Sequence, residues 1–322
     1  MNKFTKAERQ GQSKFFAYHE PGFGGFRGSA YRLDPASFER NLAPSIRNVV
    51  PVYFEQKGIQ WHTHSNHGLS SQVCCLNFLA PLTQKPKMLA GLVQAALGGD
   101  EPTMLPVEEG PDGQWFVGFE WIGGDYLNEG GKSGTRSRGA NATSADAVLM
   151  FERGGKQETL LIEWKYTESY GARISPNGNA TRLNRYENLA FSPDGPILAD
   201  LGLVLDDFFW EPFYQLLRQQ MLAFQMEKAR ENGADVVRVL HLSPTGNSAL
   251  KAVTAPKLRE YGSDFAAVWQ KLLQFPDRFK SLDISSAFQP ILQIAGGTEW
   301  TAYVTSRYSN LLSAPTESQM PT

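Results

Sequence analysis

Two apolar segments joined by a short polar turn limit the fold more than any other feature of this 322-residue chain. The segments are SADAVLMF at 144–151 and LLIEWKY at 160–166, and the turn between them contains Gly154 and Gly155. A Gly-Gly pair between two such runs predicts a β-hairpin. Both strands are apolar on both faces, so we expect the hairpin to lie at the centre of a sheet.

A hairpin centred between the two glycines determines which residues pair across it. This register places Val148 opposite Leu161 and Asp146 opposite Glu163. Because side chains alternate along a strand, Glu163 and Lys165 share a face with Asp146. The other face carries the apolar residues Ala147, Leu149, Ile162 and Trp164. The sequence therefore predicts that two carboxylates and a lysine converge on one patch.

Such a patch favours a bound cation. Like charges opposed on a sheet repel each other, and a cation between them removes the repulsion. Carboxylates suit Mg²⁺, which takes one or two of them together with waters and substrate phosphate. The ion acidifies a bound water, and Lys165 can orient that water or stabilise a pentavalent phosphorus. These residues indicate phosphodiester hydrolysis with Mg²⁺ or Mn²⁺. The alternative is a cross-strand salt-bridge cluster on a solvated sheet face.

Asp146, the hairpin turn and Glu163-Trp164-Lys165 resemble the D…(D/E)xK signature of the PD-(D/E)XK nucleases, with Ala145 where the family name has proline. The segments SSQVCCLNFLAPL, GANATSAD, IEWKYTESY and FYQLLRQQMLA are similar to a bacterial restriction-endonuclease-like branch, and the similarity covers most of the chain. The resemblance implies an α/β fold with a restriction-endonuclease-like mixed β-sheet flanked by helices and a helical N-terminal elaboration. It also implies metal binding by Asp146, Glu163 and the Trp164 carbonyl, and a setting in restriction or defence.

In related nucleases, a helix after the ExK strand carries a glutamine that faces the active site. The helix expected from Pro212 offers Gln215 and Gln219 one turn apart on one face, with Arg218 beside them. The sequence leaves open which of them points inward.

Some members also use an acidic residue from their first helix. The helix expected near Ser71 presents Gln72 and Asn77 instead. Glu120 and Glu129 are the candidates for replacing that residue.

Two segments carry basic residues that we expect to contact nucleic-acid phosphates. A Gly-rich loop at 123–141 contains Lys132, Arg136 and Arg138, and a long connection at 167–200 contains Arg182 and Arg185. Tyrosines in the second segment can stack on bases or pack the loop, and we favour packing. The alternative for the basic residues is a solvated loop.

Two further motifs suggest other kinds of site. His62, His64 and His67 are one residue short of the HxHxDH pattern of metallo-β-lactamase-fold hydrolases, because Asn66 replaces the aspartate. The histidine count fails for a two-metal site, and a single zinc stays open. Gly130-Gly131-Lys132-Ser133 is not a P-loop, because Tyr126 stands where that motif needs glycine.

Charge and cysteine content set the class of protein. The chain has 31 Lys+Arg against 33 Asp+Glu, so a nucleic-acid partner has to be held by a local basic surface. Two adjacent cysteines, Cys74 and Cys75, indicate a reducing compartment. A secretory signal and a membrane-spanning run are both missing from the pattern. We expect a cytoplasmic protein without a membrane partner.

The expected helices and strands predict a single domain with a short arm before it and a short tail after it. We expect an aperiodic N-terminal arm at 1–28, a nuclease-like domain at 29–312 and a polar tail at 313–322. The domain divides into a helical elaboration at 29–100, a catalytic core at 101–245 and C-terminal helices at 246–312. Helices are expected at 70–81, 86–97 and 212–231, and strands at 115–122, 144–151, 160–166 and 236–242.

These patterns predict a metal-dependent nuclease acting on DNA. A catalytically silent nuclease fold that binds nucleic acid or a partner is the second hypothesis, and an RNA-directed nuclease is the third. Cleavage specificity, endonuclease or exonuclease mode, and formation of a homodimer are left open by the sequence.

Overall fold

The computed structural model describes residues 2–19, 25–130, 134–140 and 142–313. This part of the chain contains a six-stranded sheet of order β1-β5-β6-β7-β8, in which β4 also pairs with β5. Its strands are β1 (Thr103–Leu105), β4 (Gly118–Trp121), β5 (Ala145–Arg153), β6 (Lys156–Trp164), β7 (Val236–Ser243) and β8 (Phe279–Asp283). Strand β5 pairs in antiparallel orientation with β1, β4 and β6. The pairs β6–β7 and β7–β8 are parallel. A small separate sheet pairs β2 (Glu108–Gly110) with β3 (Gly113–Trp115).

The predicted hairpin register is confirmed from the turn to the pair Ala147–Ile162, and the expected pairing of Asp146 with Glu163 lies just beyond the last pair. Arg153 pairs with Lys156 and Val148 pairs with Leu161 across β5 and β6. Gly154 and Gly155 have φ values of 59° and 72°, the left-handed region that a type I′ hairpin turn requires at both positions. The turn therefore sets the register of the whole central pair of strands.

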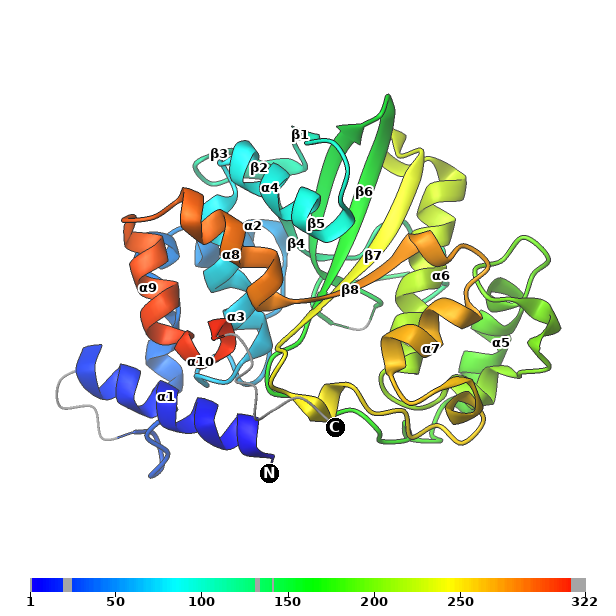
Figure 1. The fold of residues 1–322 in the computed structure, drawn as a ribbon, viewed down its shortest axis with the longest axis horizontal. Coiled ribbons are helices and arrows are strands. Elements are labelled where there is room, and N and C mark those ends of the chain that lie inside the picture. The colour runs from blue at the N-terminus through cyan, green and yellow to red at the C-terminus, as the bar shows by residue number, and fades with distance from the viewer. Residues whose placement is uncertain (1, 20–24, 131–133, 141, 314–322) are drawn as a thin grey trace.

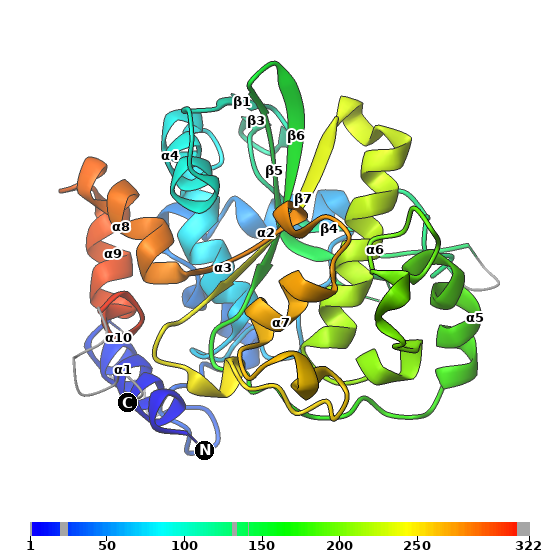
Figure 2. The same ribbon diagram turned by 45° about the vertical axis from the view of Figure 1, so that its right-hand side comes forward.

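Helices cover both faces of the sheet (Figures 1 and 2). One face packs against a core built from α2 (Val50–Lys57), α3 (Ser71–Leu79), α4 (Pro86–Leu97), α8 (Ile284–Ile294), α9 (Glu299–Arg307) and α10 (Ser309–Leu312). The other face packs against α5 (Asn179–Ala190), α6 (Phe213–Ala229) and α7 (Phe265–Leu272). Leu149 and Ile162 lie in the first core, whereas Val148 and Leu161 lie in the second. This confirms the predicted alternation and the α/β class with a mixed sheet flanked by helices.

The predicted helices are also found. Ser70 begins α3 by accepting a hydrogen bond from the Val73 N–H at 3.3 Å, and Gly98 ends α4. Asp264 and Thr298 cap α7 and α9 through their side chains. Short 3₁₀ segments connect the main elements: Pro35–Asn41, Pro44–Ile46, Ala80–Leu82, Ala199–Leu201, Leu205–Phe208, Glu231–Gly233, Ser248–Leu250, Leu258–Tyr261 and Pro276–Arg278.

Two expectations about irregular segments are wrong. The arm at 1–28 contains helix α1 (Lys3–His19), and the connection at 167–200 contains α5. The inward face of α1 consists of Glu8, Gln12, Phe15 and Phe16. Because half of these inward residues are polar, the hydrophobic periodicity that reveals most helices is missing. The tail predicted at 313–322 lies outside the described residues except for Ser313.

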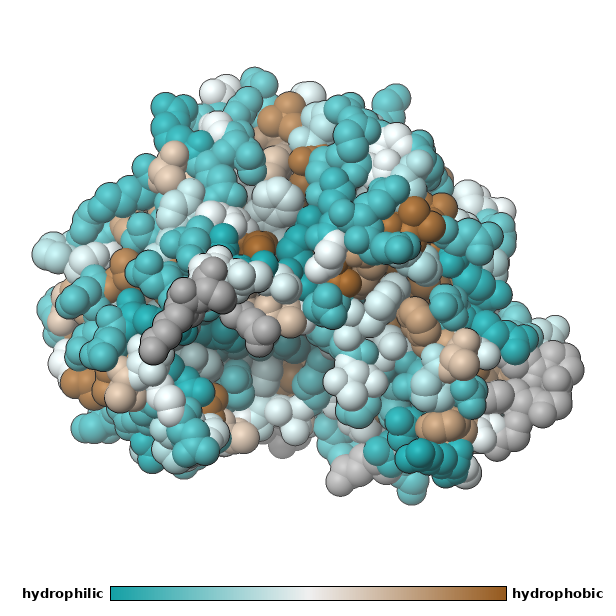
Figure 3. Space-filling view, turned by 180° about the vertical axis from the view of Figure 1, so that it is seen from behind, coloured by the Kyte–Doolittle hydropathy of each residue, from teal (hydrophilic) through white to brown (hydrophobic). Residues whose placement is uncertain are grey.

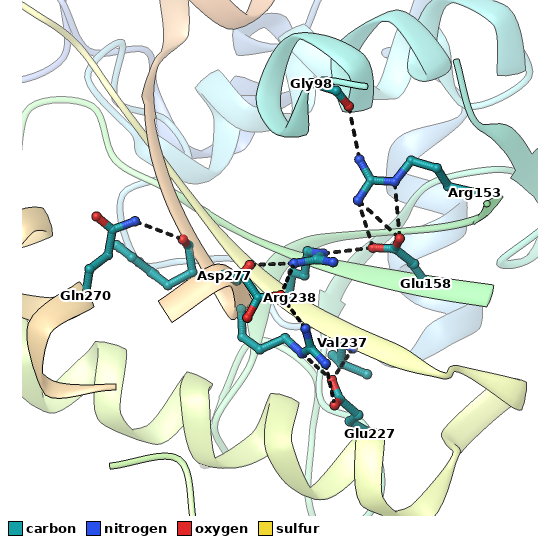
Figure 4. Close-up of polar contacts among 10 residues, drawn as sticks. Gly98, Arg153, Glu158, Glu227, Val237, Arg238, Gln270 and Asp277 are labelled. Carbon is teal, nitrogen blue, oxygen red and sulfur yellow. Dashed lines mark hydrogen bonds and ion pairs between the residues drawn. The ribbon is translucent and has the colours of Figure 1, made fainter. Parts of the chain in front are cut away.

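At its turn end, the hairpin is fastened by a network of opposite charges (Figure 4). Glu158 of β6 is buried, and its carboxylate accepts hydrogen bonds from Arg153 Nε at 3.2 Å and from Arg238 Nε at 2.8 Å. Arg238 also donates to Asp277 Oδ2 at 3.0 Å. Each buried carboxylate oxygen thus has a cationic partner, which offsets the cost of burying the charge.

Helix α1 is attached to the sheet through Tyr166, just beyond the end of β6. The Tyr166 hydroxyl donates to Glu8, and Gln12 Nε2 donates to the same hydroxyl at 3.2 Å. The same inward face of α1 also packs against α9 and α10, where Phe15 contacts Tyr303 and Gln12 contacts Arg307. Within the described residues we find no helix with both the length and the apolar character that crossing a lipid bilayer requires.

The substitution Glu8→Gln should make stability less dependent on pH. Burial raises the pKa of the Glu8 carboxyl, although the hydrogen bond from Tyr166 opposes this. The folded protein then holds a proton that the unfolded chain has released, so stability decreases as the pH rises from about 4.3 through the raised pKa. We expect the advantage of Glu8→Gln over the wild type to grow with pH, by about 1.4 kcal/mol per unit of pKa shift.

Urea denaturation between about pH 5 and pH 8 measures this difference. The exposed Glu187 of α5 provides the control substitution, Glu187→Gln. Parallel curves for the wild type and Glu8→Gln would show that the Glu8 pKa is not raised.

Candidate active site

Asp146 lies where strands β5 and β6 separate. The last residue pair between these strands is Ala147 with Ile162. Beyond this pair, the Trp164 N–H donates to Asp146 Oδ2 at 2.6 Å. A backbone N–H at the end of a ladder needs an acceptor, and the carboxylate provides it. The hydrogen bond fixes Asp146 beside the Glu163–Lys165 segment.

Glu163 and Lys165 form a buried ion pair. Their side chains are 2% and 11% exposed, and Lys165 Nζ contacts Glu163 Oε1. The Lys165 N–H donates to the Leu242 carbonyl at 2.8 Å, which continues the pairing of β6 with β7. Burial lowers the pKa of Lys165, but Glu163, Tyr170, Asp146 and Glu168 together outweigh this, and the pKa is raised well above its usual value. Lys165 is therefore an ammonium donor, and the pair is not the solvated salt bridge of the alternative hypothesis.

The site carries more negative than positive charge. Burial, together with the Glu163 and Glu120 carboxylates, raises the pKa of Asp146 well above its usual value, while Lys165 opposes the shift. Burial also raises the pKa of Glu120, and the Glu163 carboxylate adds to this. Asp146 and Glu163 share Lys165 here, and Glu120 adds a third carboxylate beside them, so the site favours an additional cation.

Of the two acidic candidates, the structure brings Glu120 to the site. Glu120 lies between Phe119 and Trp121 of β4, which pair with Ala147 and Ala145 on either side of Asp146. Gln72 of α3 donates to Glu120 Oε1 at 2.7 Å, Ser144 Oγ donates to Oε2 at 3.3 Å, and His62 Nε2 lies 3.4 Å from Oε1. The first helix therefore supplies an amide that holds an acid from the neighbouring strand.

Glu129 has a different environment. It accepts hydrogen bonds from Thr143 Oγ1 at 2.7 Å and from the Tyr186 hydroxyl at 2.6 Å. Arg218 of α6 lies 3.9 Å from Glu129 and donates to Thr143 Oγ1 at 3.3 Å. These contacts tie the loop before β5 to α5 and α6.

Helix α6 places Gln219 against the acidic residues. Gln219 Nε2 donates to Glu163 Oε2 and, at 3.4 Å, to the Ser144 carbonyl. Gln219 is 1% exposed, and its Oε1 has no hydrogen-bond partner. Gln215 lies one turn earlier, where its backbone N–H contacts Glu211, and Gln220 faces away toward Val237 and Arg278. The inward glutamine is therefore Gln219.

The basic residues of the Gly-rich loop have partners within the protein. Arg136 donates to the carbonyls of Ile122, Gly123 and Gly124 at 3.0–3.2 Å. Arg138 pairs with Glu108 at 2.9 Å and donates to the Tyr53 hydroxyl at 2.8 Å. These guanidinium groups hold the loop in shape, and their contact with phosphate stays a prediction.

In α5, Arg182 donates to the carbonyls of Ser175 and Asn177 at 2.8 and 2.9 Å. Arg185 is half-buried on the same helix. Lys132 lies outside the described residues. Binding of nucleic acid by these three residues also stays a prediction.

Three residues near the site were missed by the sequence analysis. His241 on β7 pairs with Glu163, and its Nε2 lies 2.8 Å from the Tyr170 hydroxyl. Burial, with a contribution from Lys165, lowers the pKa of His241 to about 3, so the imidazole is neutral. Glu211 precedes α6, and burial raises the pKa of its carboxyl, with Lys165 opposing. The pairing of β6 with β7 joins segments far apart in the sequence, so no local signal could place His241 beside Glu163.

The single-zinc alternative is wrong. The rings of His64 and His67 lie 6.2 Å apart, and His67 Nδ1 accepts a hydrogen bond from the Leu69 N–H at 3.1 Å. Across the described residues, no group of three or more His, Cys, Asp or Glu side chains is arranged to hold a metal ion. For a cation, the candidate site therefore offers a pair of carboxylates rather than a complete cage.

The mixed sheet, with an acidic residue and an ExK segment at the open end of its central hairpin, defines a restriction-endonuclease-like fold of the nuclease class. The chain belongs to the family described as REase-ARP, Restriction Endonuclease associating with ARP, whose model matches residues 6–309. No curated protein and no solved structure matches the chain. The family confirms the resemblance to restriction endonucleases and supports nuclease activity.

Gln219 and Gln220 provide a matched test of the site, because they are adjacent, buried glutamines of one helix. We expect Gln219→Ala to lower the cleavage rate at saturating substrate by about 10- to 100-fold, because Glu163 loses the donor that holds it. Gln220→Ala should leave this rate within about twofold of the wild type. Single-turnover cleavage of labelled DNA measures both. Equal rates for the two variants would contradict the role of Gln219.

Asp146→Asn should stabilise the protein in the absence of divalent cations. Asparagine keeps an acceptor for the Trp164 N–H but removes a charge that Glu163 and Glu120 repel. We expect the free energy of unfolding in EDTA to rise by about 1–2 kcal/mol. Urea denaturation measures it, with the exposed Asp200→Asn as the control. A loss of stability in Asp146→Asn would mean that the carboxylates do not repel each other.

Proposed function

We propose that this protein is a metal-dependent nuclease that hydrolyses phosphodiester bonds of DNA, in restriction or defence. The observation that carries the proposal is the excess of buried carboxylate at the open end of the β5–β6 hairpin, beside one protonated lysine. A charge imbalance of this kind in a buried position is typical of functional sites. Membership of a restriction endonuclease family supports the same chemistry.

The residues of the site fit a small divalent cation. Asp146 and Glu163 would hold Mg²⁺ or Mn²⁺, with the Trp164 carbonyl as a third ligand, since Mg²⁺ needs only one or two protein carboxylates. The buried Gln219 Oε1 lacks a partner and can accept a hydrogen bond from a water bound beside Glu163. When bound, the ion supplies an acidified water and neutralises charge on the phosphoryl oxygens.

Each side chain has a separate task in this proposal. Lys165 is held by Glu163 and donates to the attacking water or to the charged oxygens of the pentavalent phosphorus. The Trp164 N–H fixes Asp146, and Gln219 fixes Glu163. Gln72 holds Glu120 at the rim of the site, where its carboxylate adds negative potential. This preorganisation lets the groups act without rearranging during the reaction.

We also propose that residues 29–312 act as one nuclease domain. Both helical layers pack on the same sheet, and the site draws residues from α3, β4, β5, β6 and α6. A cut between Gln72 and Gln219 would separate residues that the site needs.

The test compares the wild type with Asp146→Ala and Lys165→Ala on plasmid, linear duplex, single-stranded DNA and RNA. We expect the wild type to cleave DNA with Mg²⁺ or Mn²⁺ and not with EDTA. Each variant should lose activity by roughly 100-fold or more, because charge stabilisation at the reacting phosphate is lost. Lys156→Ala at the hairpin turn is the control and should cleave normally.

Cleavage that survives both substitutions would refute the site. Cleavage of RNA alone would favour the RNA-directed nuclease. DNA binding without cleavage by the folded wild type would favour the silent binding module.

A further inference from the structure

The two sides of α1 have different chemistry. Glu8, Gln12, Phe15 and Phe16 face the protein. Lys3, Lys6, Gln10 and Lys14 are exposed. Their spacing of three or four residues aligns them in one stripe along the helix, on the side opposite the buried residues. We call Lys3, Lys6, Gln10 and Lys14 the α1 stripe.

The exposed surface of α1 has a single sign of charge. Within Lys3–His19 the only acidic residue is Glu8, which is 1% exposed and accepts a hydrogen bond from Tyr166. Lysine side chains on an exposed helix face contribute a local positive potential even when the whole protein is near neutrality. The chain as a whole has a formal charge of −2, so this stripe is the kind of local basic surface that an anionic polymer needs.

The packing of α1 places its N-terminal end beside the segment that follows Lys165. The Phe4 ring contacts the Tyr166 ring with centroids 6.3 Å apart, and Thr5 Oγ1 donates to the Thr167 carbonyl at 3.5 Å. Tyr166 directly follows Lys165, so α1 is attached to the segment that leaves the site. Figure 1 shows α1 at the end of the molecule opposite the β5–β6 turn. Phe4 and Thr5 belong to the first turns of α1, so the end of the helix that carries Lys3 and Lys6 lies beside the segment that leaves the site.

We propose that the α1 stripe binds the phosphate backbone of duplex DNA that enters the active site. This inference rests on the proposed nuclease function and adds the surface that holds the substrate. From Lys3 to Lys14 the helix rises about 16 Å, a length of duplex that carries roughly ten phosphates. Contacts of this kind position the duplex without reading its sequence. Seen from the side opposite to that of Figure 1, the surface of the molecule is mainly hydrophilic, and its hydrophobic residues are scattered (Figure 3).

Salt dependence of binding tests the proposal directly. Affinity for a labelled duplex is measured by fluorescence anisotropy at several salt concentrations, with the wild type and a Lys3→Gln/Lys6→Gln/Lys14→Gln variant. The slope of log K against log salt is negative, and each lost phosphate contact reduces its magnitude by about 0.9. We therefore expect the magnitude of the slope to be smaller by roughly 2–3 in this variant. The control triple variant, Lys85→Gln/Lys87→Gln/Lys156→Gln, removes equal charge from exposed lysines outside α1. Its slope and cleavage rate should match the wild type.

A gain of charge gives a second measurement that does not depend on loss of function. Gln10 lies within the stripe, so Gln10→Lys should increase the magnitude of the slope by about 0.9 and tighten binding at low salt. Circular dichroism during thermal unfolding verifies that all variants fold. Unchanged slopes for both the triple variant and Gln10→Lys would overturn the inference.

The outcomes separate this inference from the proposed function. If the wild type neither binds nor cleaves DNA, the nuclease proposal itself fails. If the wild type cleaves DNA and Asp146→Ala does not, but the triple variant keeps the wild-type slope, only the role of the α1 stripe fails. A slope change seen with RNA duplex alone, or a loss of binding confined to phosphatidylserine vesicles, would also overturn the assignment to DNA.

Discussion

The hydrogen bond from the Trp164 N–H to Asp146 is the interaction on which the site depends. It forms where β5 and β6 stop pairing, so a side chain takes the place of a backbone acceptor. This brings Asp146 beside Glu163 and Glu120 in surroundings that are apolar on both sides of the sheet. The raised pKa values of Asp146 and Glu120 reflect the cost of that arrangement. Stability is given up at the open end of the hairpin in exchange for a preorganised anionic site.

The two ends of the hairpin differ in whether their buried carboxylates have enough cationic partners. At the turn, Glu158 lies between Arg153 and Arg238, so its charge is matched (Figure 4). At the open end, Asp146 and Glu163 share Lys165, and Glu120 adds a third carboxylate beside them. Since the strands are otherwise alike, this difference in charge balance locates the reactive end of the sheet. It also explains why one pair of strands can be both the rigid centre of the fold and the scaffold of its chemistry.

A second layer of polar contacts connects the chain ends to the site. Arg307 of α9 is buried and donates to Gln12 Oε1 at 2.9 Å, while Gln12 donates to Tyr166. The N-terminal helix, the C-terminal helices and the end of β6 are thereby joined in one network. Buried groups of this kind are costly unless every member has a partner, so the network favours a single docking position for α1. That position determines where the α1 stripe lies relative to Lys165.

The sequence by itself determined the hairpin, its register and the alternation of its two faces, because a Gly-Gly turn and a two-residue period are local properties. It therefore predicted that Asp146, Glu163 and Lys165 belong together. Only the tertiary structure decided that Gln219 faces Glu163 instead of Gln215, that Glu120 joins the acids instead of Glu129, and that His241 lies beside Glu163. It also revealed α1, whose inward face is half polar. These positions depend on how elements distant in the chain pack against each other, and a local sequence pattern does not determine that packing.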